Sequence, residues 1–185
     1  MNLETERLFI RPIKSEDLDD FLEYRSDPKV CEFQGFQPMD AEKAKNFIKS
    51  TENSEFGIAG EWIQLVVQLK EEKKLIGDIG LKPESYETRV VEFGITFSAK
   101  YQKKGLAKEA LTGVFDLLFE RAGIHRIIGI TDVKNENCIK LLESLKFRRE
   151  GEFKQSFWDH GKNKWRDEFI YAILEEEWKK SVASA

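Results

Sequence analysis

The stretch that decides the fold reads Val-Val-Glu-Phe-Gly-Ile-Thr-Phe over 90–97, followed by Gln-Lys-Lys-Gly-Leu-Ala over 102–107. The first run is apolar and β-rich, which predicts a strand. The second opens a run with apolar residues at helical spacing, from Leu106 to about Ala122. At such a junction, free backbone N–H groups and the positive end of the helix dipole face outward. Gly105 lets a ligand approach the main chain, and Lys103 and Lys104 add positive charge. The junction therefore predicts a cradle for an anion such as a pyrophosphate, although an ordinary tight turn with two solvated lysines fits the same residues.

The flanking sequence alternates between strand and helix patterns. On the N-terminal side we expect a strand over 7–13, a helix starting at Ser15 and ending at Pro28, a second helix capped by Asp40, and a hairpin of strands over 62–69 and 75–81. On the C-terminal side we expect a strand over 126–133, a short helix over 135–145, and strands over 147–157 and 165–174. This order predicts the α/β class with a mixed, mostly antiparallel sheet and flanking helices.

The strand 90–97, the helix 106–122 and the strand 126–133 form a βαβ unit, so these two strands should run parallel. The 185 residues contain no repeat, no low-complexity segment and no linker rich in Pro, Gly or Ser. We therefore expect one domain over 1–185.

Composition excludes several classes of function. The net charge of −4 argues against a nucleic-acid binder, so any basic residues that hold an anion must be local. The two Cys and two His stand at no metal-ligand spacing, and we expect no metal. Neither a signal peptide nor a run long enough to span a membrane is visible, which predicts a cytoplasmic protein with reduced thiols.

Gln102, Gly105 and Ala107 match the pattern Gln/Arg-x-x-Gly-x-Gly/Ala, and the junction resembles motif A of the GNAT superfamily of N-acetyltransferases. Three further blocks are similar to its RimJ/RimL-like branch, which acetylates the N-termini of ribosomal proteins. They are Thr-Glu-Arg-Leu-Phe-Ile-Arg-Pro over 5–12, the segment 135–147, which resembles "Asn-x-x-Ser … Leu-Gly-Phe", and residues 167–171 with Glu177 and Trp178.

The resemblance implies a GNAT fold in which the two parallel strands splay apart and acetyl-CoA lies in the opening. It implies that the co-substrate is bound by residues of the junction and by the segments on either side of it. These are Phe97 or Ser98, whose backbone N–H would serve the oxyanion, Gln102, Lys103, Lys104, Gly105, Leu106 and Ala107 in the cradle, and Asn135 on the pantetheine arm. Asn135 is also well placed as a helix N-cap, and Ser98 as a turn residue.

Two residues are candidates for proton transfer. Glu92 borders the expected cleft, where the branch often has Glu, and its carboxylate can accept the ammonium proton. It equally fits an exposed strand residue paired with Arg89 or a lysine, and Glu32 and Glu61 are rivals. Cys138 occupies the position of a branch Ser that lies near the CoA sulfur. A neutral thiol, with an ordinary pKa near 8.5, can protonate the leaving thiolate; a small buried helix residue is the alternative.

Two positions depart from the family pattern. The Tyr that many members use as general acid is replaced by Leu142, and the Gly of Leu-Gly-Phe is replaced by Lys146, which predicts a strained turn. The aromatic residues Phe33, Phe36, Trp62, Phe157, Trp158 and Trp165 are core or pocket-wall candidates.

The resemblance implies an acetyl-CoA-dependent N-acetyltransferase that acts through a ternary complex. The first acceptor class is a protein N-terminal α-amine, whose pKa near 8 demands only a modest base. Small amines (an aminoglycoside, a polyamine or an amino-acid analogue) are the alternative acceptors, and a CoA-binding module without catalysis is the rival from another class. Both a monomer and a homodimer remain open.

Overall fold

A computed structural model of the protein describes residues 1–183, and across these residues the strands form one eight-stranded sheet with the order β1-β2-β3-β4-β5-β6-β8-β7. The strands are β1 (Leu3–Glu4), β2 (Leu8–Pro12), β3 (Ile63–Leu69), β4 (Lys74–Pro83), β5 (Val90–Phe97), β6 (Arg126–Asp132), β7 (Arg148–Asp159) and β8 (Lys164–Leu174). Strands β5 and β6 pair in parallel, and the other neighbours in this order are antiparallel. The predicted class, α/β with a mixed and mostly antiparallel sheet, is confirmed.

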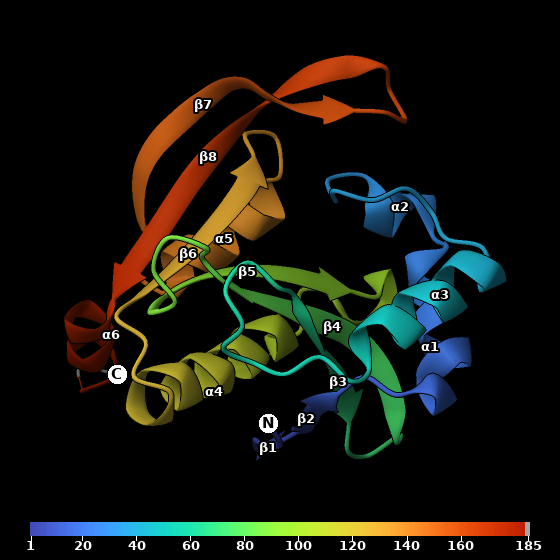
Figure 1. Ribbon diagram of the computed structural model, residues 1–185, viewed down its shortest axis with the longest axis horizontal. Helices are drawn as coiled ribbons and strands as arrows, with labels where there is room; N and C mark the ends of the chain where they lie inside the picture. Colours follow the sequence, from blue (N-terminus) through green and yellow to red (C-terminus); the bar gives the residue numbers. More distant parts are fainter. Residues whose placement is uncertain (184–185) are drawn as a thin grey trace.

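The helices cover both faces of the sheet (Figure 1). They are α1 (Leu18–Arg25), α2 (Pro28–Cys31), α3 (Ala41–Thr51), α4 (Leu106–Arg121), α5 (Glu136–Ser144) and α6 (Glu175–Ala183), with 3-10 turns at Ser15–Asp17 and Ala99–Tyr101. Successive side chains of a strand point to opposite faces. Leu65 and Val67 therefore join the core beneath α4, whereas Val66 between them joins the core beneath α1 and α3.

The N-terminal helical region differs from the expectation. Pro28 ends α1, as predicted, but it also begins α2, because Pro is tolerated at the first position of a helix. Asp27 caps this short helix by accepting a hydrogen bond from the Lys29 N–H at 2.9 Å. The Ser15 hydroxyl caps nothing and instead donates to Glu52 at 2.5 Å. Asp40 caps α3 as predicted, through the Lys43 N–H at 2.8 Å.

The parallel pair splays apart halfway along its length. Residue pairing between β5 and β6 extends from Val90 and Arg126 to Phe93 and Gly129 and then stops. Beyond that point β5 continues against β4 and β6 continues against β8. An opening therefore lies between residues 94–97 of β5 and residues 130–132 of β6.

Strands β7 and β8 form a long hairpin that extends beyond the rest of the sheet, and its far end approaches α2 (Figure 1). The segment after α2 is tied to this hairpin, because Arg166 Nη2 donates to the Glu32 carbonyl at 2.7 Å. None of the helices within residues 1–183 is long and apolar enough to cross a membrane.

Candidate active site

The start of α4 gathers the six residues that the sequence assigned to an anion cradle. Gly105 is the N-cap of this sixteen-residue helix, and the first backbone bond inside the helix runs from the Glu109 N–H to the Gly105 carbonyl at 3.0 Å. The N–H groups of Leu106 and Ala107 precede that bond and lack an intrahelical acceptor. Lys103 and Lys104 are exposed beside them. This arrangement fits a diphosphate, which a helix N-terminus and two ammonium groups attract.

Glycine is required at position 105 chiefly by its backbone conformation. Its φ of +77° is left-handed, a region that a Cβ disfavours. A Cβ placed there would lie 3.5 Å from Arg7 Nη2, which is an ordinary contact distance. Lys103 adopts a left-handed φ of +61° without the freedom of glycine. The loop is thus held in a conformation that is costly for at least one of its residues.

The backbone of β5 decides which N–H groups face the opening. The Ser98 N–H donates to the Ile76 carbonyl of β4 at 2.8 Å, so it is already engaged and cannot serve an oxyanion. Backbone bonding alternates along an antiparallel pair, so Phe97 and Ile95 turn their N–H and C=O groups away from β4, toward the splay. Of the two predicted donors, the geometry therefore favours Phe97, and it adds Ile95, which sequence reasoning missed.

Side chains on both sides of the opening bind the carbonyls of these two residues. Gln102 Nε2 donates to the Phe97 carbonyl at 2.9 Å, which ties the cradle loop to the end of β5. Gln34 Nε2 donates to the Ile95 carbonyl at 3.2 Å from the segment after α2. The two bonds confirm that the carbonyls point into the splay rather than toward β4.

Helix α5 begins on the other side of the opening. Asn135 is its N-cap, and the side-chain Oδ1 accepts from the Cys138 N–H at 3.2 Å. Burial raises the pKa of the Cys138 thiol, and a hydrogen bond with Thr131 on β6 offsets only part of that rise. The thiol is therefore neutral near neutral pH, the state in which it can donate a proton.

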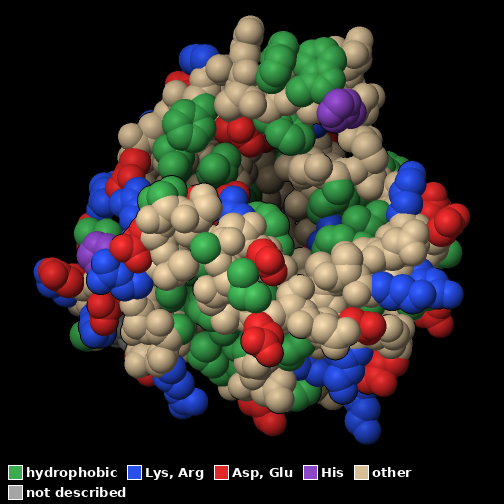
Figure 2. Space-filling view, viewed as in Figure 1, with side chains coloured by type: hydrophobic (Ala, Val, Ile, Leu, Met, Phe, Trp, Pro, Cys, Tyr) green, Lys and Arg blue, Asp and Glu red, His purple; other side chains and the backbone are tan. Residues whose placement is uncertain are grey.

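A cavity of about 520 Å³ occupies the opening and the space between the sheet and the segment after α2. It lies behind a hollow near the centre of the surface in Figure 2. The aromatic residues of its lining are Phe33, Phe36, Phe47, Trp62, Phe93 and Phe157. Four of the six aromatic candidates thus line it, whereas Trp158 and Trp165 lie outside its lining.

A buried ion cluster forms the floor of this cavity. Asp78 accepts from Tyr24 Oη at 2.7 Å, from Arg25 Nε at 3.0 Å, from Arg25 Nη2 at 2.5 Å and from Gln64 Nε2 at 2.5 Å. The Arg25 guanidinium stacks on the Phe36 ring, 3.9 Å from its centroid. No fully buried polar side-chain atom within residues 1–183 lacks a hydrogen-bond partner, so the cluster is a rigid platform for the aromatic wall.

A second buried cluster closes the opposite wall. Arg166 on β8 donates through Nη1 to Asp132 at 2.9 Å and through Nε to Asp159 at 2.7 Å. These bonds join the end of β6 to the hairpin. Neither cluster has a local signal in the sequence, since their members are separated by up to 54 positions.

Glu92 lines the cavity, and its carboxylate is paired with a lysine, as the alternative interpretation held. Lys82 Nζ lies 2.5 Å from Glu92 Oε2 and 3.4 Å from Glu84 Oε1. Burial alone would lower the pKa of Lys82, but its hydrogen bond to Glu92 and the two negative charges outweigh burial and raise it. The rivals Glu32 and Glu61 lie outside the cavity lining.

The two departures from the family pattern have clear structural counterparts. Leu142 is 1% exposed within the core, so that position supplies no acid. Lys146 is left-handed with a φ of +64°. The Phe147 N–H donates to the Leu142 carbonyl and the Lys146 N–H to the Glu143 carbonyl, each at 3.0 Å. This is a Schellman motif, which usually places glycine at that position, so the predicted strain is present.

Comparison with known proteins agrees with this architecture. Residues 7–148 match the family described as "Acetyltransferase (GNAT) domain". The uncharacterized N-acetyltransferase YnaD of Bacillus subtilis (strain 168) is 34% identical over 178 residues, which cover 96% of this chain and 99% of that protein. The spermidine N(1)-acetyltransferase of Escherichia coli (strain K12) is 28% identical over 153 residues, 82% of this chain and 78% of that one.

A solved structure of a GNAT-family acetyltransferase from Bacillus anthracis superposes with a TM-score of 0.84, at 31% identity, covering 96% of this chain and all of that chain. The chain therefore belongs to the GNAT family of acetyl-CoA-dependent N-acetyltransferases.

Proposed function

We propose that the protein transfers the acetyl group of acetyl-CoA to a primary amine seated in the cavity between β5, β6 and the segment after α2, within a ternary complex. The proposal rests on one observation: the opening between β5 and β6 connects the cradle at the start of α4 with the aromatic cavity. The cradle at the start of α4 lies at one end of β5, and the aromatic cavity lies along the same strand. Both substrates can therefore meet at the N–H groups of Phe97 and Ile95.

Each part of the site would have its own role in binding the co-substrate or in the acetyl transfer. The loop 102–107 would hold the diphosphate, and Asn135 would contact the pantetheine arm. The N–H of Phe97 or Ile95 would donate to the oxygen that gains negative charge as the amine attacks the carbonyl. Glu92 would accept the ammonium proton on the oxygen that Lys82 leaves free, and the Cys138 thiol would return a proton to the departing sulfur.

A protein N-terminal α-amine is the acceptor class that we propose first. The cavity opens to the surface, so a peptide can enter by its end while the rest of the chain stays outside. An α-amine has a pKa near 8, and a sizeable fraction is already neutral at physiological pH. This suits a base that is held in an ion pair with Lys82. The resemblance of the 5–12 segment to the RimJ/RimL-like branch supports the same acceptor.

A small polycationic amine is the second candidate, favoured by charge. The cavity lining carries four carboxylates, of Asp78, Glu92, Asp132 and Glu168, against two guanidinium groups. Glu168 accepts a hydrogen bond from the Ser156 hydroxyl at 2.7 Å, and its carboxylate lines the cavity where a second ammonium group could contact it. The relationship to a spermidine acetyltransferase also supports this acceptor.

The test is release of free CoA thiol from acetyl-CoA against peptides beginning with Ser or Ala, against spermidine and spermine, and against aminoglycosides. The acetylated atom is then located by mass spectrometry. Turnover on the peptides at their α-amine supports the first proposal. Turnover confined to polyamines or aminoglycosides replaces it with the second class. Tight CoA binding without turnover on any of these acceptors contradicts both proposed acceptor classes and favours a CoA-binding module or an acceptor of another class.

A further inference from the structure

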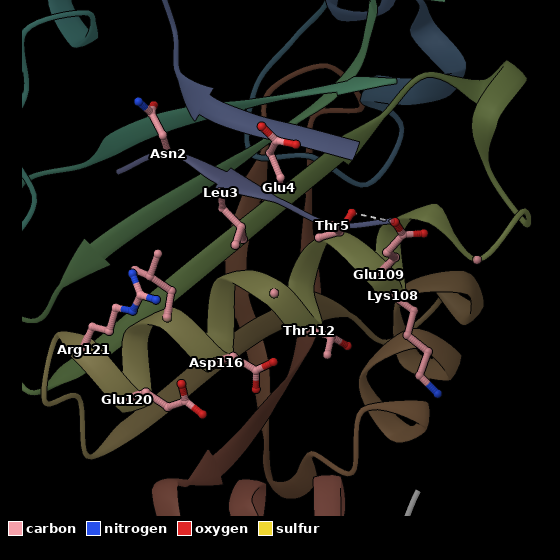
Figure 3. Close-up of a pocket in the computed structure, with 13 residues that line it drawn as sticks. Asn2, Leu3, Glu4, Thr5, Lys108, Glu109, Thr112, Asp116, Glu120 and Arg121 are labelled. Atoms are coloured by element: carbon pink, nitrogen blue, oxygen red, sulfur yellow. Dashed lines mark hydrogen bonds between the residues drawn. The ribbon is translucent and has the colours of Figure 1, made fainter. Parts of the chain in front are cut away.

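The N-terminal segment lies beside α4 at the edge of the sheet, and Figure 3 shows Leu3 and Thr5 directed at that helix. A Cβ on Gly113 would lie 2.9 Å from Leu3 Cδ2 and 3.1 Å from Thr5 Cγ2. Glycine inside a helix costs about 1 kcal/mol relative to alanine. Position 113 therefore trades helix stability for close contact with the N-terminal segment.

Glu109 joins the same two elements through hydrogen bonds. Its Oε1 accepts from Thr5 Oγ1 at 2.5 Å and from the Arg7 N–H at 2.8 Å, and its Oε2 accepts from Arg7 Nε at 2.6 Å. The dashed line in Figure 3 marks the bond to Thr5. Glu109 lies four residues after Gly105 and four before Gly113, so all three share one face of α4. The segment is thus fixed to the helix along two turns.

Arg7 links the N-terminal segment to the cradle loop as well as to α4. Its Nη1 donates to the Lys104 carbonyl at 3.2 Å, immediately before Gly105. Lys103 and Gly105 both have left-handed backbones, so the loop needs contacts outside itself to keep that conformation. Arg7 is absent from the lining of the central cavity. It reaches the loop without bordering the space in which the acceptor would sit.

We propose that Arg7, oriented by Glu109, is a positioning residue for the acetyl-CoA cradle. It fixes the Lys104 carbonyl and thereby aims the N–H groups at the start of α4. The inference rests on the proposed placement of the diphosphate at that helix start. An arginine suits the role because its planar fork bonds Glu109 through Nε and Lys104 through Nη1 at the same time. A lysine offers one point charge and cannot keep both bonds in this geometry.

The experiment compares Arg7→Ala and Arg7→Lys with the control Lys70→Ala. Lys70 ties the same N-terminal segment from another side, by donating to the Thr5 carbonyl at 2.7 Å and pairing with Glu4 at 3.0 Å. Within residues 1–183, the side chain of Lys70 makes no bond to the cradle loop. CoA binding is measured by titration calorimetry on the full chain, circular dichroism checks folding, and steady-state kinetics vary acetyl-CoA and amine separately.

We expect both Arg7 variants to weaken CoA binding and to raise the KM for acetyl-CoA about tenfold. The kcat at saturating acetyl-CoA and the KM for the amine should stay within twofold of the wild type. Lys70→Ala should change CoA affinity less than twofold.

Three results would overturn the assignment: CoA affinity of Arg7→Ala within twofold of the wild type, equal losses in Arg7→Ala and Lys70→Ala, or a fall in kcat with the KM for acetyl-CoA unchanged. Each of these leaves the proposed function standing, because the wild type binds CoA. A wild type that fails to bind CoA overturns the proposed function and this inference with it.

Discussion

Replacing Asp78 by alanine tests the buried cluster beneath the acceptor cavity. The side chains of Asp78 and Arg25 are 2% and 5% exposed, and Arg25 directs two hydrogen bonds at the carboxylate. The substitution leaves a guanidinium in the interior without its counter-ion, and breaking a buried pair in this way costs about 3–5 kcal/mol. Tyr24 and Gln64 lose their acceptor as well. We therefore expect a loss of at least about 3 kcal/mol in the free energy of unfolding.

The assay is urea unfolding followed by circular dichroism, with the free energy extrapolated to water. Lys140→Ala is the control, because its ion pair with Glu136 spans 3.3 Å between side chains that are 72% and 78% exposed, and such pairs contribute less than about 0.5 kcal/mol. Removing both charges with Arg25→Met and Asp78→Leu should recover about 2 kcal/mol or more of the loss, since paired apolar replacements are tolerated. A loss below about 1 kcal/mol for Asp78→Ala, or a double variant as unstable as the single one, would refute the reasoning.

Three further outcomes are expected. If Glu92 is the base, Glu92→Gln should lower kcat/KM at pH 6 far more than at pH 9, where the free amine is abundant; a profile parallel to that of the wild type from pH 6 to 9 would remove Glu92 from that role. Lys146→Gly should stabilise the fold by about 0.5–1 kcal/mol in urea unfolding, because it relieves a left-handed non-glycine residue; a less stable variant would contradict this. Hydrogen bonds from Lys100 and then Lys74 lower the pKa of Glu23 from 4.5 to about 2. The ionised Glu23 therefore stabilises the fold above pH 4.5, and this contribution is lost as the pH falls toward 2. Between pH 4.5 and pH 2, the free energy of unfolding of the wild type should fall more than that of Glu23→Gln. The difference should be small because the Glu23 side chain is 39% exposed.

The elements with strong local signals were predicted well. The strand over 90–97 and the helix from Leu106 are confirmed, because apolar periodicity and capping residues act within a few positions of one another. Helix α2 was missed because four residues carry no period, and no helix was predicted for α6, of which only Glu177 and Trp178 were noted, through the family resemblance.

The candidate site was likewise predictable where it depends on neighbouring residues and not where it depends on residues far apart in the sequence. The cradle residues 102–107 are contiguous, so their common location at a helix start followed from the sequence. The choice between Phe97 and Ser98 did not follow from the sequence, because it depends on which residues of β5 bond to β4. That register is set by pairing with a separate strand. Glu92 was rightly placed beside the cavity, but its partner Lys82 lies on the neighbouring strand, and no local rule selects it over Arg89.

The sequence by itself determined the order of the main strands and helices, the parallel pair and the location of residues 102–107 at a helix start, since each depends on backbone preferences and side-chain periods over a few consecutive residues. Tertiary structure alone decided the splay beyond Phe93, the ion clusters of Asp78 and Arg166, and the contact of Arg7 with the Lys104 carbonyl. These features join residues far apart in the chain. Their energies come from desolvated charges and matched hydrogen bonds, which exist only once the sheet and helices have excluded water.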